Sequence, residues 1–234
     1  MPNPTESQPT RVHIVSATRR TREEFWSASA LGLSLRRFAD DDRLVPWIAY
    51  ENRQGLPDIY NQLIEPSVPA GVAVFIHDDV WLDDAFFVDR LLEGLEHFDV
   101  IGLAGNRRRV ARQPGWAFVD ESFNLDERSN LSGAVCHGDN ASGRITRFGP
   151  AGVPVELLDG IMIAAHTDTL LRHECRFDPR FKFDFYDLDF CRTARQKAMR
   201  LGTWPISVTH QSRGAFGTDS WTAALHEYRN KWPD

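Results

Sequence analysis

The stretch Val72-Ala73-Val74-Phe75-Ile76-His77-Asp78-Asp79 carries the clearest fold signal in this 234-residue sequence. Its first five residues form an unbroken apolar run, which is typical of a strand buried on both faces of a parallel sheet. Three polar residues follow directly, at the carboxyl end of that strand. Ligands of open α/β sheets bind beyond this end of the strands. The stretch therefore predicts an α/β sheet and also predicts where its binding site lies.

Strand and helix patterns alternate on both sides of this stretch. Thr21 is an N-cap candidate, and apolar residues then recur at helical spacing up to Phe38. The elements expected in the first half are strands over 12–16, 44–50 and 100–105 and helices over 22–38, 58–64 and 83–95. Such alternation is the signature of an α/β layered domain.

The second half of the chain is less regular. Residues 106–152 are rich in Gly, Asn, Ser and Arg and have poor periodicity, so we expect irregular chain with room for short antiparallel strands. Apolar character resumes over 155–163, and the elements expected after it are helices over 168–172, 184–199 and 221–232 and a strand over 204–209. The sequence has no internal repeat. We therefore expect a flexible tail over 1–10 followed by a single domain over 11–234.

The composition excludes several classes of protein. Hydrophobic residues make up 42% of the chain and charged residues 26%, which argues against a disordered chain or a fibre. The 27 Lys and Arg against 33 Asp and Glu give a net charge of −6, which argues against a dedicated nucleic-acid binder. No apolar run is long enough to span a membrane, and no export leader is visible. Three scattered cysteines favour a reducing compartment, so we expect a cytoplasmic location.

Three polar clusters are candidates for a functional site. The adjacent carboxylates of Asp78 and Asp79 are costly to hold together without a cation, and a Mg²⁺ or Mn²⁺ ion with a diphosphate would relieve the repulsion. A solvated acidic turn is the alternative. In the run from Asp184 to Asp189, a carboxylate could act as a general base or could cap the helix that begins there. His210, after the last predicted strand, is either a structural side chain or a neutral metal ligand.

Together, and in this order, the clusters resemble the family 2 glycosyltransferases, which have the GT-A fold. The run from Phe75 to Val80 looks like that family's variant of the Asp-x-Asp motif, with His77 in the leading position. The resemblance covers roughly residues 12–232 and is weakest over 106–152. An early loop of this chain resembles the family's loop that faces the nucleotide. This loop contains Asn52, Gly55, Leu56, Tyr60 and Asn61. The segments similar in spacing to the acceptor half of bacterial members are Leu158-Asp159-Gly160, Arg176-Phe177-Asp178, Phe183 to Asp189, Gly202 and His210.

The resemblance implies a fold and a reaction. The fold would be a single α/β domain with a mostly parallel, Rossmann-like sheet flanked by helices. Its nucleotide-binding half would cover about 11–105 and its acceptor half about 106–234. The reaction would be a metal-dependent, inverting transfer of a sugar from a UDP, GDP or dTDP donor to a hydroxyl of a carbohydrate or another acceptor. Mn²⁺ or Mg²⁺, held by Asp79 and His210, would neutralise the leaving diphosphate.

The resemblance also implies roles for individual residues. Asp187 is the first candidate for the general base that activates the acceptor hydroxyl, and Asp189 is the second. Asp159 is expected to approach the acceptor or the donor sugar. The residues expected to bind the donor are Asn52, Asn61, His77 and Asp78. Independently of the resemblance, Trp116 is a candidate for stacking on a sugar, because it is an aromatic residue in the irregular stretch.

Two other functions compete with this interpretation. A catalytically silent module that binds a nucleotide or a sugar would carry the same clusters. A phosphohydrolase built on His77 and Asp78 is less well supported, because such sites need further histidines on helices. The sequence lacks Gly-x-x-x-x-Gly-Lys-Ser/Thr and Gly-x-Gly-x-x-Gly, which argues against an ATPase and a dehydrogenase. The basic run Arg107-Arg108-Arg109 with Arg112 is either a solvated face or a contact for a phosphorylated acceptor.

Overall fold

A six-stranded sheet lies at the centre of the computed structural model, which describes residues 9–212 and 216–233. β10 runs antiparallel to both of its neighbours, and every other neighbouring pair in this sheet is parallel. The expectation of a mostly parallel sheet is confirmed, with the correction that the sheet is mixed because this strand is reversed. The strands in spatial order are β11 (Leu201–Thr203), β5 (Val100–Gly102), β10 (Met162–His166), β3 (Val72–Ile76), β1 (Val12–Ala17) and β2 (Leu44–Ala49).

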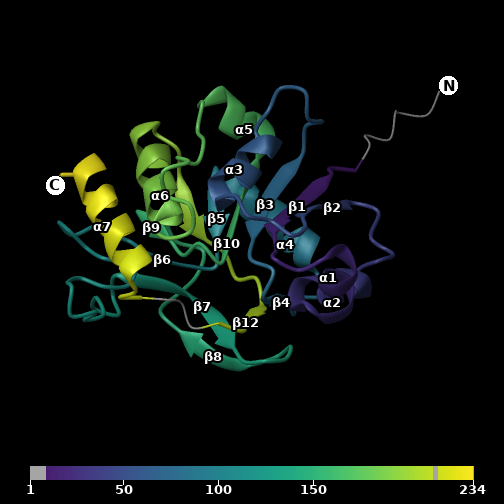
Figure 1. Ribbon diagram of the computed structural model, residues 1–234, viewed down its shortest axis with the longest axis horizontal. Helices are drawn as coiled ribbons and strands as arrows, with labels where there is room; N and C mark the ends of the chain where they lie inside the picture. Colours follow the sequence, from purple (N-terminus) through teal and green to yellow (C-terminus); the bar gives the residue numbers. More distant parts are fainter. Residues whose placement is uncertain (1–8, 213–215, 234) are drawn as a thin grey trace.

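Helices cover both faces of this sheet (Figure 1). Alternate residues of β3 point to opposite faces, as strand geometry requires, and all five are at most 1% exposed. Val72, Val74 and Ile76 pack on the face covered by α1 (Arg22–Ala28), α2 (Ala30–Arg37) and α4 (Phe87–His97). Ala73 and Phe75 pack on the face covered by α3 (Leu56–Tyr60), α5 (Thr167–Arg172), α6 (Tyr186–Gln196) and α7 (Asp219–Lys231). The α/β prediction made from this stretch is therefore confirmed.

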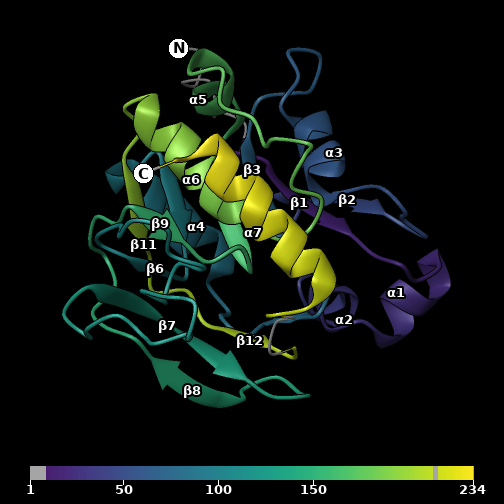
Figure 2. The same cartoon turned by 60° about the vertical axis from the view of Figure 1, so that its left-hand side comes forward.

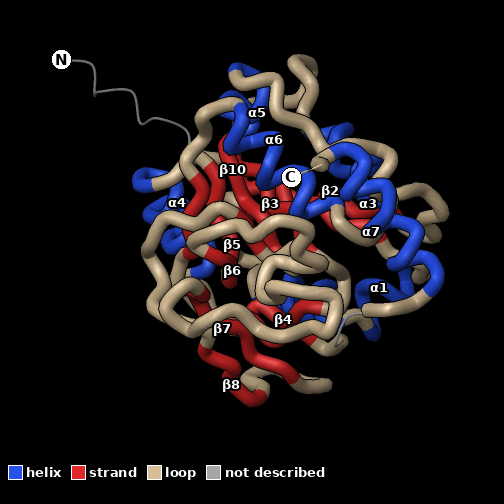
Figure 3. The backbone as a smooth tube through the Cα atoms, turned by 90° about the vertical axis from the view of Figure 1, so that its left-hand side faces the viewer, coloured by secondary structure: helices blue, strands red, loops and turns tan. Residues whose placement is uncertain are grey.

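A second, mixed sheet lies beyond the carboxyl end of β3 (Figure 3). The chain passes from β3 to the first strand of this sheet through only three residues, His77, Asp78 and Asp79. The polar turn that follows the apolar run therefore lies at the junction of the two sheets. The strands in spatial order are β4 (Val80–Leu82), β12 (Val208–His210), β7 (Leu131–His137), β6 (Ala104–Asn106) and β9 (Leu157–Leu158), and β8 (Arg144–Arg147) pairs with β7.

Several predicted elements are divided in the structure. The helix expected over 22–38 is two helices, because Ser29 ends α1 and caps α2 by accepting a hydrogen bond from the Gly32 backbone N–H. The strand expected over 100–105 is two strands, β5 and β6, which belong to different sheets. The strand expected over 204–209 is wrong at its start, since residues 204–207 are irregular and β12 begins at Val208.

Other elements differ in their limits. The helix expected over 58–64 is α3 followed by a 3-10 turn over Asn61–Leu63, and the helix expected over 83–95 begins only at Phe87. β7 and β8 are antiparallel strands within the stretch 106–152. Within the described part of the chain, no helix is both long and apolar enough to cross a membrane. Most of the tail expected over 1–10 lies outside the described residues.

Candidate functional site

A cavity of about 370 Å³ opens where the carboxyl end of β3, the second sheet and the start of α6 meet. Its volume is in the range usual for small-molecule sites. Most of the residues selected from the sequence line it, and they come from five separate segments of the chain. These residues are His77, Asp78, Asp79, Trp116, Asp159, Asp187 and His210.

Strand pairing explains why His210 reaches Asp79. β12 pairs antiparallel with β4, so that His210 lies opposite Val80, the residue after Asp79. The Gln211 backbone N–H donates a hydrogen bond to the Asp79 carbonyl, with an N···O distance of 3.1 Å. His210 Nε2 lies 3.3 Å from Asp79 Oδ1, and His77 Nδ1 lies 4.0 Å from the same oxygen. One potential ligand atom from each of these three residues lies within 4.8 Å of the other two.

The Asp79 carboxylate has the electrostatic character of a cation ligand. Its Oδ1 is buried without a well-aligned hydrogen bond, although His210 Nε2 is close. Burial alone would raise the pKa of this carboxyl, but the neighbouring His210 and His77 imidazoles outweigh burial and hold the pKa at about 2. Burial lowers the pKa of His77, which favours the neutral imidazole that metal coordination requires. A carboxylate with two imidazole neighbours is a donor set that fits a divalent cation.

Asp78 lies in the cavity wall but outside this cluster of three residues. Its Oδ2 accepts a hydrogen bond from the Thr18 hydroxyl at 2.5 Å. Thr18 follows β1, which is parallel to β3, so both residues lie at the same edge of the sheet. Asp78 is therefore held at the carboxyl ends of two neighbouring parallel strands, where ligands of α/β sheets bind.

Asp159 and Trp116 contact each other in the cavity wall. The Trp116 indole Nε1–H donates to Asp159 Oδ2 at 2.6 Å, and the Ile161 backbone N–H donates to Asp159 Oδ1 at 2.9 Å. Asp159 directly follows β9, whereas Trp116 comes from the irregular chain between β6 and β7. The two residues selected as sugar contacts thus form one hydrogen-bonded pair.

Asp187 lies in the first turn of α6 and faces the cavity. Its Oδ2 accepts a hydrogen bond from the Gly160 backbone N–H at 2.9 Å. Burial, followed by the negative charge of Asp159, raises the pKa of Asp187 to about 7. Backbone N–H groups at the start of α6 and at Gly160 lower this pKa. Their effect is smaller than the rise that burial and Asp159 cause, so helix capping does not determine the pKa of Asp187. A carboxylate with a pKa near 7 suits general-base catalysis at neutral pH.

The backbone around Asp187 has two unusual features. A Cβ atom at Gly160 would lie 2.5 Å from the Tyr186 hydroxyl and 3.0 Å from Asp187 Cβ, so only glycine allows this close approach of α6. Phe185, immediately before α6, has a φ of 65°, which is rare for a bulky side chain. Strained backbone of this kind clusters at functional sites. The Phe185 ring packs against Trp221 of α7, with the centroids 5.3 Å apart, which helps to hold this conformation.

The structure does not bring three of the selected residues to the cavity. The Asn52 side chain forms a local turn by hydrogen bonding with the Gln54 backbone. The Asn61 side chain bonds both the N–H and the carbonyl of Phe177. Neither asparagine lines the cavity, because each amide is already engaged in holding a loop.

Asp189 is the third of these residues, and it connects two helices instead. Its side chain is fully buried, with Lys231 Nζ 2.6 Å from Oδ1 and the Trp232 indole Nε1–H donating to the same oxygen at 2.9 Å. Figure 2 shows α7, which ends at Lys231, lying alongside α6. Asp189 does not line the cavity, so its contacts support an anchoring role rather than the role of a second base.

Several residues that line the cavity were not among the candidates from the sequence. The Tyr186 hydroxyl donates to the Gly160 carbonyl at 2.7 Å and lies 2.8 Å from His77 Nε2. The Phe183 ring stacks on His77, with the centroids 5.8 Å apart. Both residues belong to the aromatic and acidic run from Phe183 to Asp189, in which only carboxylates were chosen as candidate site residues. His137 enters through the pairing of β7 with β12, which no local sequence pattern indicates.

The basic run lies outside the cavity. Arg108 forms an ion pair with Asp126, with NH2 2.5 Å from Oδ1. None of Arg107, Arg108, Arg109 and Arg112 is among the residues that line the cavity. The described lining contains five aspartates and three histidines but no lysine or arginine. The cavity is therefore acidic, and this run does not supply a counter-charge to it.

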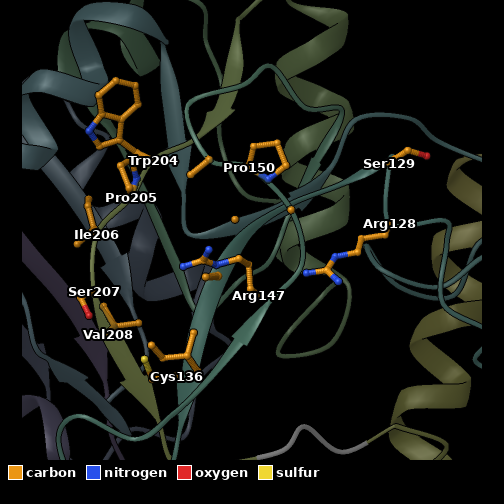
Figure 4. A pocket seen from close by; sticks show the side chains of 15 residues that line it. Arg128, Ser129, Cys136, Arg147, Pro150, Trp204, Pro205, Ile206, Ser207 and Val208 are labelled. Carbon is orange, nitrogen blue, oxygen red and sulfur yellow. The ribbon is translucent and has the colours of Figure 1, made fainter.

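A larger hollow of about 920 Å³ lies on the second sheet (Figure 4). The segment from Trp204 to Val208 lines one side of it, and Arg128 and Arg147 lie across from that segment. The residues that line it include no carboxylate and no imidazole. This hollow therefore lacks the acid, base and metal ligands that the smaller cavity combines.

Comparison with known proteins gave one matching family model and many similar solved structures. A sequence model described as "Glycosyltransferase like family" matches residues 42–230. No curated protein matches the chain. Among solved structures, the chain is similar to the mannosyltransferase PcManGT from Pyrobaculum calidifontis in complex with GDP-Man and Mn²⁺, with 12% identity and a TM-score of 0.45 over 93% of this chain and 61% of that one.

The second similar structure is GalNAc-T7 with UDP, GalNAc and Mn²⁺. Its identity is 11% and its TM-score 0.47, over 94% of this chain and 48% of that one. The chain thus spans only about half to three-fifths of the length of these two structures.

Proposed function

The chain belongs to the glycosyltransferase-like family, and from this premise we propose that it transfers a sugar from a nucleotide-diphosphate donor to an acceptor hydroxyl in a metal-dependent reaction. The observation that carries the proposal is the composition of the cavity, in which a possible cation site and a carboxylate with a pKa of about 7 lie together. The described lining contains five aspartates, which would repel a diphosphate. A divalent cation would offset this repulsion when a nucleoside diphosphate binds among these aspartates.

The residues that would hold the cation are Asp79, His210 and His77. His77, expected from the sequence to bind the donor, lies close enough to serve as a third ligand. Nitrogen donors are poor ligands for Mg²⁺, which prefers oxygen, so a set with two imidazoles favours Mn²⁺. When bound, the cation would stabilise negative charge on the leaving diphosphate. Complexes of PcManGT and GalNAc-T7 with Mn²⁺ and nucleotides agree with this choice of ion and donor class.

Asp187 would act as the general base. The acceptor oxygen forms a bond to the anomeric carbon, while the bond from that carbon to the diphosphate oxygen breaks and its electron pair leaves with the diphosphate. The hydroxyl proton passes to the Asp187 carboxylate. A single base with direct displacement inverts the anomeric centre, so we propose an inverting reaction.

The remaining cavity residues would orient the substrates. Asp78 lies at the strand edge, where it could accept hydrogen bonds from the donor ribose. Asp159 is held by Trp116 and Ile161 and lies beside Asp187, where it could orient the transferred sugar. We propose that donor binding depends on Asp78 more than on Asn52 and Asn61, because both asparagine amides are engaged within the protein.

Thermal denaturation with a panel of UDP-, GDP-, dTDP- and CMP-sugars, each with and without Mn²⁺, tests this function. A bound nucleotide raises the melting temperature by mass action. We expect one nucleotide class to stabilise the wild-type protein only when Mn²⁺ is present. In His210→Ala, we expect this Mn²⁺-dependent stabilisation to be lost. Stabilisation without release of the nucleoside diphosphate in the presence of any acceptor would support the silent binding module instead. Equal stabilisation with and without the metal would contradict the proposed cation site.

A further inference from the structure

The lining of the cavity combines polar and apolar side chains. The carboxylates and imidazoles come from strand ends and from the start of α6. The irregular chain before β7 and the region where α7 begins contribute six further lining residues, Pro114, Ala117, Phe118, Leu125, Phe216 and Trp221. We define these six residues as the apolar wall. Because the apolar wall comes from other segments than the carboxylates, it can contact a different part of the substrates.

Interlocked aromatic rings build the apolar wall. Phe118 lies edge-on to Phe216, with the centroids 5.4 Å apart, and edge-on to Phe123 at 5.3 Å. Phe123 in turn packs against Trp221 at 5.5 Å. Such contacts between rings hold the wall in place without a ligand. The wall is therefore a formed surface rather than a set of unconnected side chains.

Large apolar side chains stay exposed at the cavity mouth. Leu125 is 60% exposed and Phe216 49% exposed, and Phe183 across the mouth is 56% exposed. Exposed apolar residues are ordinary when scattered, but a contiguous group beside a cavity marks a binding surface. Continuity with the catalytic carboxylates identifies what binds there, because the reacting hydroxyl must lie next to Asp187.

The apolar wall offers few hydrogen-bond partners to a carbohydrate. Its side chains include only one polar atom, the indole nitrogen of Trp221. The nearby Gln113 amide is buried and donates to the Gly115 carbonyl at 2.9 Å, so it is already engaged. Sugar hydroxyls placed against this wall would lose water without gaining partners, which is costly. An anionic acceptor is also disfavoured, because five aspartates in the described lining would repel it.

We propose that the acceptor is a neutral phenol or aromatic alcohol whose ring system lies against the apolar wall and whose hydroxyl points to Asp187. This inference rests on the proposed function for the identity of the reacting group. The binding of the ring system itself requires neither a donor nor a metal. It can therefore be tested separately from catalysis.

The test is a binding titration of the metal-free protein with three probes. 2-Naphthol is a neutral aromatic alcohol, 2-naphthyl phosphate places a negative charge on the same ring system, and maltose is a neutral carbohydrate. We expect saturable binding of 2-naphthol, measured by its fluorescence and by calorimetry, and weaker binding of the other two. Phe216→Ser and Leu125→Ser should each weaken 2-naphthol binding by about tenfold, as expected for the loss of one apolar contact.

Phe86→Ser is the matched control. Phe86 is 65% exposed, precedes α4 and does not line the cavity, so this change should leave the affinity unaltered. Tighter binding of maltose than of 2-naphthol would overturn the proposal, and so would equal affinities of wild type and Phe216→Ser. If 2-naphthol binds as expected but no nucleotide sugar is consumed, the proposed glycosyl transfer fails while the assignment of the apolar wall stands.

A second inference rests on a different observation, the hydrogen bonds of Tyr186. The Tyr186 hydroxyl has one hydrogen, and the Gly160 carbonyl, 2.7 Å away, can only accept it. Toward His77 Nε2, 2.8 Å away, the same hydroxyl must therefore act as the acceptor. Nε2 then carries the ring hydrogen, and a neutral His77 keeps its lone pair on Nδ1, the nitrogen that faces Asp79.

We infer that Tyr186 is a positioning residue that selects the His77 tautomer and so offers Nδ1 to the cation. Tyr186 is 3% exposed, which limits competition from water for this hydrogen bond. Phe183 stacks on the His77 ring with an interplanar angle of 21°, which further restricts its orientation. Partners that orient a metal-binding histidine in this way typically change metal affinity by about 10- to 100-fold when removed.

Tyr186→Phe tests this inference, because it keeps the ring and removes the hydroxyl. In the metal-free wild type, we expect the side-chain nitrogen NMR spectrum to show His77 protonated at Nε2, and in the variant a mixture of tautomers. Mn²⁺ affinity, measured from the EPR signal of the free ion, should fall by about tenfold. Tyr50→Phe is the control, since its hydroxyl accepts a hydrogen bond from Trp26 away from the cavity. A wild-type His77 protonated at Nδ1, or an unchanged Mn²⁺ affinity in Tyr186→Phe, would overturn the inference.

Discussion

Two aspartates in the first turn of α6 have the same chemistry and opposite surroundings. Asp187 faces the cavity and contacts the Gly160 backbone, and no lysine or arginine is among the described residues that line this cavity. Asp189 faces α7 and lies 2.6 Å from the Lys231 ammonium. Burial raises the pKa of both carboxyls, but only Asp187 of the two lines the cavity. The comparison shows that the role of a buried carboxylate is decided by the group opposite it.

The largest expected effect is a loss of turnover on substitution of Asp187 but not of Asp189. Asp187→Asn should lower turnover by about 10² to 10⁴, the usual contribution of a general base. Donor affinity should remain near the wild-type value, because the base acts on a proton that moves only in the transition state. Turnover is measured by release of the nucleoside diphosphate, and affinity by calorimetry with the donor that the thermal panel identifies.

Asp189→Asn is the matched control for that experiment. It makes the same chemical change two residues away, on the side of α6 that faces α7. We expect its turnover to stay within about threefold of wild type, since Asp189 does not line the cavity. If Asp189→Asn lost activity and Asp187→Asn retained it, the roles of the two residues would be reversed.

The next effect concerns stability on the α7 side. Lys231→Met leaves Asp189, which is fully buried, without the ammonium that faces it. Loss of one partner of a buried ion pair costs about 3 kcal/mol of unfolding free energy, measured by urea denaturation at pH 8. The cost should shrink as the pH falls and Asp189 becomes protonated. An equal loss at pH 8 and pH 4 would mean that Lys231 stabilises the fold through packing alone.

A smaller stability effect of opposite sign is expected on the cavity side. The pKa of Asp187 is about 7 in the folded protein and near 3.8 without the fold, so ionising Asp187 opposes folding. This cost is absent below about pH 4, grows as the pH rises and is complete above pH 7. Asp187→Asn removes this cost, so it should stabilise the protein at pH 8 and leave its stability unchanged at pH 4. A destabilised variant at pH 8 would show that Asp187 acts mainly as a helix cap.

The smallest expected effect is a displacement of the pH profile. The proposed mechanism needs ionised Asp187, so kcat/KM should rise with pH through about 7. Asp159 is the charge that raises this pKa after burial, so Asp159→Asn should move the rising limb to lower pH. Asp178→Asn, beside Lys231 on the other side of α6, should leave the limb in place. If the rising limb of the pH profile stays in place in Asp159→Asn, the charge of Asp159 does not influence the pKa of Asp187.

The parts of the fold that were predicted correctly carry local signals. The buried run 72–76 is visible as five apolar residues, and most helices show apolar residues at helical spacing. The change of sheet at Leu103 leaves no comparable pattern, because it depends on which strands pair on either side. The break at Ser29 was missed although its cap is local, since apolar residues continue at helical spacing through it. β7 was hidden for the same reason, since its pairing with β6, β8 and β12 joins distant segments.

The candidate site divides in the same way. The resemblance assigned His210 and Asp79 to one metal site, and in the structure His210 Nε2 lies 3.3 Å from Asp79 Oδ1. Asn52 and Asn61 were selected by resemblance to an early loop, but hydrogen bonds to the Gln54 and Phe177 backbones engage their amides. Tyr186 was overlooked, because its contacts with His77 and Gly160 appear only when α6 meets the end of β3.

The sequence by itself determined the fold class, the family and the chemical types gathered after the strands, because apolar runs, turn residues and acidic clusters are local features. It left open which aspartate of the α6 cluster faces a substrate. Residues two positions apart on a helix point about 200° away from each other, so Asp187 and Asp189 cannot share one environment. Only the tertiary structure decided between them, by placing Gly160 and the cavity beside the first and Lys231 of α7 beside the second.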